Sequence, residues 1–266
     1  MTEFPVTGPI TLVIEVASGD IEVIAEEGST ATVDIQPSDR RDASRELAEA
    51  TTTELNGDTL RVIAPRRSGG FLRRDGSLRV RAIVPVDSTV RVDCASADVA
   101  LRGALGEVHL DGASSDLRIE QLAGGRIKTA SGDVEIGRAT GQLSVGSASG
   151  DVVIEHAGGA TRISTASGDI KVQEAGGDVQ VKTASGDTRI DTARHGSIRI
   201  DAASGDVRVG VVAGTGVWLD LHTMSGDTRN ELAMHDGPGT PANGHQLGLQ
   251  VRTMSGDIDI RRVEVR

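Results

Sequence analysis

A short turn motif, Ala-Ser-Gly-Asp, recurs along this chain at a nearly constant interval, and no other feature restricts the fold as strongly. Successive copies are 17 to 21 residues apart, except that 30 residues separate the last two. The serines of the nine copies are Ser96, Ser114, Ser131, Ser149, Ser167, Ser185, Ser204, Ser225 and Ser255. The first two copies are degenerate and read "ASAD" and "ASSD", and the last two have Met in place of Ala. A further copy lies apart from the others, at Ser18. Recurrence of one turn at a fixed period predicts a stack of equivalent structural units.

Aliphatic and polar residues alternate on both sides of every turn. In the copy at Ser185, Val181 precedes the turn and Ile190 follows it, and Lys182 and Arg189 occupy intervening positions. This alternation indicates strands with one buried face. One pair of such strands cannot bury its apolar face alone, whereas stacked pairs fill a shared core.

These patterns predict an all-β fold, a single-stranded β-solenoid (β-helix) with about 18 residues per coil. One short helix is expected near the N-terminus. The alternative is an antiparallel β meander or sandwich, because each turn could also close a hairpin. The recurrence of the same residue types at every corner favours the solenoid, since stacking brings equivalent positions together.

The residues of the turn are expected to serve architecture rather than chemistry. Glycine permits a positive φ, an aspartate side chain accepts backbone N–H groups, and the Ala before most of the serines suggests a narrow corner. Stacked carboxylates about 5 Å apart repel by roughly 1 kcal/mol in bulk water, which turn N–H donors could offset. One Asp per coil is too few for the 6–8 oxygen ligands of Ca²⁺, so we predict neither a metal site nor a catalytic residue. The predicted turn-forming residues are Ser131, Gly132, Asp133, Ser149, Gly150, Asp151, Ser167, Gly168, Asp169, Ser185, Gly186, Asp187, Ser204, Gly205 and Asp206.

The ends of the repeat array require protection from edge-to-edge association. Residues 1–94 are expected to form an N-terminal β region that caps the solenoid of residues 95–266, the two making one continuous domain. The cap would contain a helix over 38–50, with Ser38 or Asp39 at its N-cap, and a hairpin through Asn56 and Gly57. The charged segment "IRRVEVR" at the C-terminus is expected to blunt the opposite edge. Open solenoid ends would also allow homo-oligomers to form end to end.

Two segments interrupt the period and are candidates for interaction. "PRRSGGFLRRDGS" (65–77) could dock an acidic partner or a lipid head group, although such loops are more often simply solvated. "NELAMHDGPGTPANGHQ" (230–246) could form a metal site from its histidines, but nothing in the spacing fixes ligand geometry. The candidate interaction residues are Arg66, Arg67, Phe71, Arg73, Arg74, Trp218, His235 and His245.

Composition excludes several functions. The formal net charge of −11 argues against nucleic-acid binding, and the three aromatic residues are too few for sugar or single-strand stacking platforms. We recognise no signal peptide and no apolar run of membrane-spanning length, so we expect a cytoplasmic protein without direct membrane insertion. No cofactor motif is present, and the glycine-containing turns do not open a strand–helix unit.

The repeats "TASGDVEI", "SASGDVVI", "TASGDIKV" and "TASGDTRI", with the opening "GPITLVIEVASGDIEVIAEE" and the pre-repeat "LRVRAIVPVDSTVRVDCASADV", resemble a bacterial "putative adhesin" family of unknown function. This family has SGDV-type β-strand repeats and is grouped with toastrack domains. The resemblance implies a β-solenoid and a link to bacterial envelope stress. We therefore expect a non-enzymatic interaction scaffold with a protein partner. The alternatives are adhesin-like binding of a glycan or Ca²⁺, and a β-helical carbohydrate-active enzyme.

Overall fold

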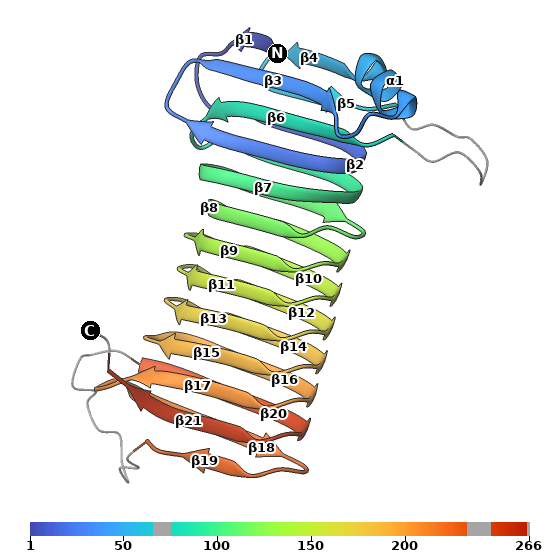
Figure 1. Ribbon diagram of the computed structural model, residues 1–266. Helices are drawn as coiled ribbons and strands as arrows, with labels where there is room; N and C mark the ends of the chain where they lie inside the picture. The colour runs from blue at the N-terminus through green and yellow to red at the C-terminus, as the bar shows by residue number, and fades with distance from the viewer. Residues whose placement is uncertain (66–75, 233–245, 265–266) are drawn as a thin grey trace. The chain divides into compact units, whose positions relative to one another are not determined.

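The computed structural model describes residues 1–65, 76–232 and 246–264, and it consists almost entirely of strands (Figure 1). The chain forms two compact units, Met1–Asp133 and Val134–Arg266. In both units successive turns of the chain are paired as parallel strands. The prediction of a β-solenoid is therefore confirmed, and the antiparallel alternative is wrong for the repeats.

Each coil of the second unit has one strand before its Ser-Gly-Asp turn and one after it. The strands before the turn are β10 (Leu143–Ser149), β12 (Thr161–Ser167), β14 (Val179–Ser185), β16 (Gly196–Ser204), β18 (Gly216–Thr223) and β20 (Gln246–Ser255). Those after the turn, together with the first strand of the unit, are β9 (Val134–Ala139), β11 (Val152–Ala157), β13 (Ile170–Ala175), β15 (Thr188–Ala193), β17 (Val207–Val212), β19 (Thr228–Asn230) and β21 (Ile258–Val263). Val145 lies opposite Ile163, which lies opposite Val181, so each coil advances by 18 residues as expected.

The core of this unit consists of columns of aliphatic side chains that match the predicted alternation. Val145, Ile163 and Val181 form one such column and are completely buried. The second turn of each coil narrows to a column of buried alanines that includes Ala157 and Ala175. The alanines that precede the serines are exposed, so the narrow corner predicted there is wrong and lies at the other turn instead.

The last two coils do not stack in the order of the sequence. β20 lies between β16 and β18, and β21 lies between β17 and β19, so the final repeat returns to a position inside the stack (Figure 1). The inward positions of β20 and β21 are aliphatic and buried, whereas β19 offers Thr228 and Asn230 at the same positions. The more apolar coil therefore occupies the interior. The outermost coil is therefore formed by β18 and β19, and of the segment "IRRVEVR" only Ile260 has a strand neighbour on both sides among the described residues.

The first unit contains the long strands β2 (Thr11–Glu26), β7 (Thr89–Gly112) and β8 (Leu117–Ser131), which stack as coils. The outlying turn copy belongs to this stack, because Ser18 lies opposite Ser96 and Asp20 lies opposite Asp98. The predicted boundary between the capping region and the solenoid, at residues 94 and 95, falls inside the continuous strand β7.

On its other side β2 pairs with β5 (Thr59–Ile63) and β6 (Leu78–Pro85). The antiparallel strands β4 (Thr52–Asn56) and β3 (Thr30–Pro37) cover β5 and β6, and β1 (Thr2–Pro5) pairs with β3. The hairpin predicted through Asn56 and Gly57 is confirmed, with Gly57 at a φ of 59°.

Helix α1 (Asp42–Ala50) contacts β3 and β6 through a face that buries Ser44 and Leu47. Its N-cap is Arg41, whose side chain makes no capping hydrogen bond, so the predicted cap at Ser38 or Asp39 is wrong. Asp39 instead accepts the backbone N–H of Arg41, the residue that precedes the first residue of the helix, at 3.0 Å. Among the described residues, no helix is long and apolar enough to cross a membrane.

Candidate functional site

The aspartates of the turns form a ladder of hydrogen bonds between coils. The backbone N–H of Asp187 donates to Oδ1 of Asp169 at 2.8 Å, and the N–H of Asp206 donates to Oδ1 of Asp187 at 2.8 Å. At the end of the stack the ladder follows the spatial order of the coils, from Asp206 to Asp257 and then to Asp227. These carboxylates therefore act as acceptors for the neighbouring turn, which offsets their mutual repulsion.

The glycine of the turn meets two requirements at once. Gly186 has a φ of 122°, and a Cβ added there would lie 2.2 Å from the carbonyl oxygen of Gly168 in the adjacent coil. A residue with a side chain would therefore be strained and would also collide with backbone.

A third component of the turn is a buried hydroxyl two residues before the serine, which our sequence interpretation missed. Thr183 Oγ1 donates to the carbonyl oxygen of Ser185 at 3.1 Å, and Thr253 does the same to Ser255 at 3.1 Å. The available signal was the frequent Thr or Ser at this inward position, where an aliphatic residue would continue the alternation.

Groups that could perform chemistry are scarce in the described part of the chain. No cluster of three or more His, Cys, Asp or Glu residues there could hold a metal ion. Burial raises the pKa of the Cys94 thiol, which lies 3.4 Å from the hydroxyl of Ser115. Because the thiolate is the nucleophilic form, a thiol with a raised pKa is poorly suited to catalysis.

Most of the predicted interaction residues lie outside the described residues. These are Arg66, Arg67, Phe71, Arg73, Arg74, His235 and His245. Trp218 is described: it lies on β18, and its side chain is 65% exposed.

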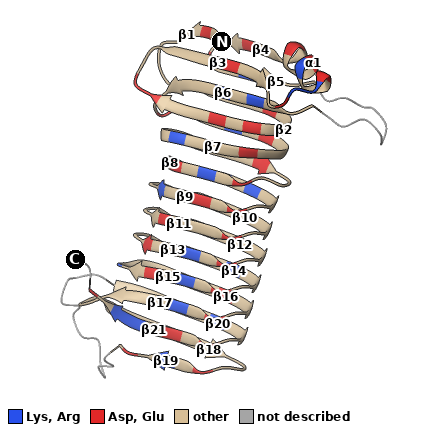
Figure 2. Cartoon of the chain, viewed as in Figure 1, with Lys and Arg blue, Asp and Glu red and all other residues tan. Residues whose placement is uncertain are grey.

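Charged side chains of both signs lie along the strand faces of each unit (Figure 2). Several of them form ion pairs in the second unit. Glu174 on β13 interacts with Arg194 and with His156, whose Nδ1 lies 2.9 Å from its Oε2. The hydrogen bond from Arg194 holds the pKa of Glu174 below its usual value, and the hydrogen bond from His156 acts in the same direction.

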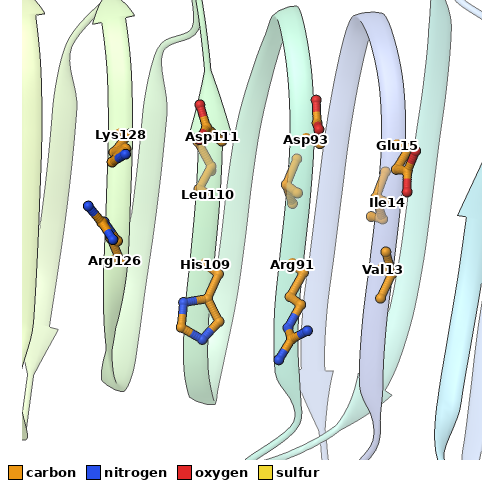
Figure 3. Close-up of a pocket in the computed structure, with 11 residues that line it drawn as sticks. Val13, Ile14, Glu15, Arg91, Asp93, His109, Leu110, Asp111, Arg126 and Lys128 are labelled. Carbon is orange, nitrogen blue, oxygen red and sulfur yellow. The ribbon is translucent and has the colours of Figure 1, made fainter. Parts of the chain in front are cut away.

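A hollow of about 260 Å³ lies on the outer face of the first unit, over β2, β7 and β8 (Figure 3). Its walls are two rows of outward side chains, one residue from each successive coil. The first row contains Val13, Arg91, His109 and Arg126, and the second contains Glu15, Asp93, Asp111 and Lys128. In-register pairing fixes this arrangement: Val13 lies opposite Arg91, and His109 lies opposite Arg126.

The basic groups of this hollow differ from those of the second unit. His109 lies 3.2 Å from Glu107, but Arg91, Arg126 and Lys128 form no ion pair with any residue that the structure describes. On the corresponding strands of the second unit, Arg162 donates to Gln180 at 3.0 Å and Arg199 donates to Gln250 at 2.6 Å. The exposed cations of the hollow are thus available to carboxylate or phosphate groups of a binding partner.

Our sequence interpretation did not single out the hollow, although a signal was present. The residues of its first row each stand five positions before a turn serine, and those of its second row stand three positions before one. The serines concerned are Ser18, Ser96, Ser114 and Ser131. At the position five before, the copies at 96, 114 and 131 carry Arg91, His109 and Arg126, whereas the copy at Ser149 carries Ser144.

Comparison with known proteins identifies the family of this chain. Solved structures with a similar arrangement include a "putative adhesin" from Bacteroides fragilis NCTC 9343, with 11% identity and a TM-score of 0.45 over 98% of this chain and 95% of that one. Another is a "putative lipid binding protein" from Parabacteroides distasonis ATCC 8503, with 14% identity and a TM-score of 0.41 over 98% and 95% of the two chains. Among curated proteins, none matches this sequence. The family model described as Toastrack DUF4097 matches residues 10–261, and the chain therefore belongs to the Toastrack DUF4097 family.

Proposed function

We propose that this protein is a non-enzymatic interaction scaffold that binds a protein partner through the charged hollow over β2, β7 and β8. The observation that carries the proposal is the set of exposed cations, Arg91, Arg126 and Lys128, which lack ion-pair partners among the described residues. Glu15, Asp93 and Asp111, which share the second row with Lys128, add the opposite charge to the hollow. A partner surface with complementary charges would gain both association rate and specificity from this pattern.

The chemistry of the described residues supports binding rather than catalysis. The ladder carboxylates accept backbone N–H groups, and the pKa of the Cys94 thiol is raised by burial. The hollow lies on the outer face of the strands, and its walls are charged side chains from successive coils (Figure 3). Stacked repeats commonly use such extended faces to bind other proteins.

A pair of double variants tests the proposal. Arg91→Ala with Arg126→Ala removes the two unpaired guanidinium groups, and Arg162→Ala with Arg199→Ala removes two that are already hydrogen-bonded. We expect proteins captured by the wild type from a lysate of its natural host to be lost with the first variant and retained with the second. Capture should also weaken as salt is raised, because exposed charges are screened. Equal capture by both variants, with unchanged thermal unfolding, would contradict the proposed site.

The envelope-stress context is a separate part of this proposal and rests on the family resemblance. We expect the transcript to rise when the host cell wall is damaged, which quantitative transcript measurement would show. An unchanged transcript would remove this link and leave the binding role to be judged by the capture experiment.

A further inference from the structure

We infer that two copies of this chain associate head to head through the edge of β18 that pairs with no strand among the described residues, with β18 of each copy pairing antiparallel to its equivalent. This inference does not depend on the proposed partner site, which lies in the other unit. It rests on three features of the outermost coil: an unpaired strand edge, a partly open core and a self-complementary sequence.

The first feature is the strand edge. β18 pairs with β20 on one side, and within the described residues no strand lies on its other side (Figure 1). In the first unit, by contrast, antiparallel strands cover the coil formed by β2. An unpaired edge presents a row of backbone donors and acceptors that can pair with another strand.

The second feature is the state of the core at this edge. Val217, Leu219 and Leu221 point inward from β18 but are only half-buried, whereas the residues opposite them on β20 are completely buried. The apolar surface extends outward as well. Trp218 is 65% exposed and Met224 is 73% exposed, and Met254 at the same corner of the adjacent coil is exposed as well. Covering this apolar surface with a second copy would remove it from water.

The third feature is the sequence of β18, which suits a two-fold axis at Leu219. Antiparallel pairing about Leu219 places Val217 opposite Leu221 of the second copy, so that inward side chains meet inward side chains and the two cores join. Trp218 then faces Asp220 of the second copy. An axis at Asp220 would instead set two carboxylates directly opposite each other, which is unfavourable.

Substitutions at Trp218 test the interface, because the side chain is exposed and is not needed for the core of the monomer. We expect the wild-type full chain to form a concentration-dependent dimer in sedimentation velocity. Trp218→Asp places like charges opposite each other and should weaken dimerisation by about thirtyfold or more, the loss typical of a central interface tryptophan. Trp218→Lys should retain more dimer than Trp218→Asp, because lysine would face Asp220. The matched control is Arg189→Asp on the exposed face of β15, which should dimerise like the wild type.

Cysteine crosslinking tests the register in a Cys94→Ala background. Residues opposite each other in antiparallel strands have Cα atoms about 4.5–5.5 Å apart, within the range of a disulfide. Leu219→Cys should therefore form a covalent dimer on oxidation, and Leu221→Cys should not. A wild-type chain that stays monomeric at every concentration would overturn the inference, as would equal crosslinking by the two cysteine variants. Trp218→Asp should leave partner capture through Arg91 unchanged, so failure of the dimer and failure of the proposed function are distinguishable.

Discussion

Replacement of Gly186 by alanine tests whether the Ser-Gly-Asp turn holds adjacent coils together. Gly186 stands at the corner between β14 and β15 with a φ of 122°, a backbone conformation that L-residues rarely adopt. The alanine Cβ would lie 2.2 Å from the carbonyl oxygen of Gly168, and ordinary contact begins near 3.4 Å. The two coils must therefore separate locally by about an ångström or the turn must change its conformation.

The cost of this change follows from two contributions. Holding a residue with a side chain in such a conformation costs about 1–3 kcal/mol. Separation of the turns would also break the hydrogen bond from Asp187 N–H to the Asp169 carboxylate, and a hydrogen bond to a charged group contributes about 1.5–3 kcal/mol. We therefore expect Gly186→Ala to lower the free energy of unfolding by about 2.5–6 kcal/mol, the sum of the two contributions, which is a large fraction of the 5–15 kcal/mol typical of a domain.

Gly176→Ala is a matched control within the same coil. Its φ is not positive, and the nearest atom to an added Cβ is the carbonyl oxygen of Ala157 at 3.6 Å, an ordinary contact. This variant should unfold like the wild type or gain up to about 1 kcal/mol, because alanine restricts the unfolded chain. Urea unfolding of the three proteins, followed by circular dichroism, measures both effects. If Gly186→Ala and Gly176→Ala unfold at the same denaturant concentration, the account of the turn given above is wrong.

Three further predictions concern single sites in the second unit. Thr188→Val should raise the free energy of unfolding by about 1–2 kcal/mol, because the buried Thr188 Oγ1 has no hydrogen-bond partner among the described residues; a lower midpoint in urea would contradict this. Glu174→Gln should lower the melting temperature at neutral pH but should have no effect well below pH 4.5. Because the pKa of Glu174 is lower in the folded protein than in the unfolded chain, the ionised carboxylate stabilises the fold at pH values above the unfolded pKa, and this stability is lost as the pH falls through the folded pKa. A difference from the wild type that persists at low pH would refute this prediction. The order of the last coils can be tested with pairs of cysteines in a Cys94→Ala background. Cysteines that replace Arg199 and Gln250 should crosslink on oxidation, whereas cysteines that replace Arg199 and Asp220 should not, because β20 lies between their strands. The reverse result would show that the coils stack in the order of the sequence.

The sequence allowed the coil to be predicted well, because each coil repeats the same physical requirements. Alternation around Ser185 defined two half-buried strands, and Gly186 and Asp187 defined the corner between them. These features depend on residues within one coil and on its identical neighbours. Local pattern is sufficient in such a case.

The order of the last coils could not be predicted in this way, because any two copies offer the same pairing pattern. The information lies instead in the inward positions: Thr228 and Asn230 are polar where Ile258 and Ile260 are apolar. A polar pair is tolerated at the edge of a stack and is costly inside it.

The candidate site escaped prediction for the opposite reason, because it lies where the copies differ. A position required by the solenoid has the same residue type in every coil, so the aspartates are identical and serve the turns. Outward positions are free of that requirement, so their side chains can differ from coil to coil. The position shared by Arg91, His109 and Arg126 is occupied by Ser144 in the following copy. It is occupied by Arg again at Arg162 and Arg199, where the guanidinium groups are hydrogen-bonded to glutamines. Trp218 stands beside Gly248 on the neighbouring strand. In this fold the residues that vary between coils, rather than those that repeat, are therefore the ones to examine for binding.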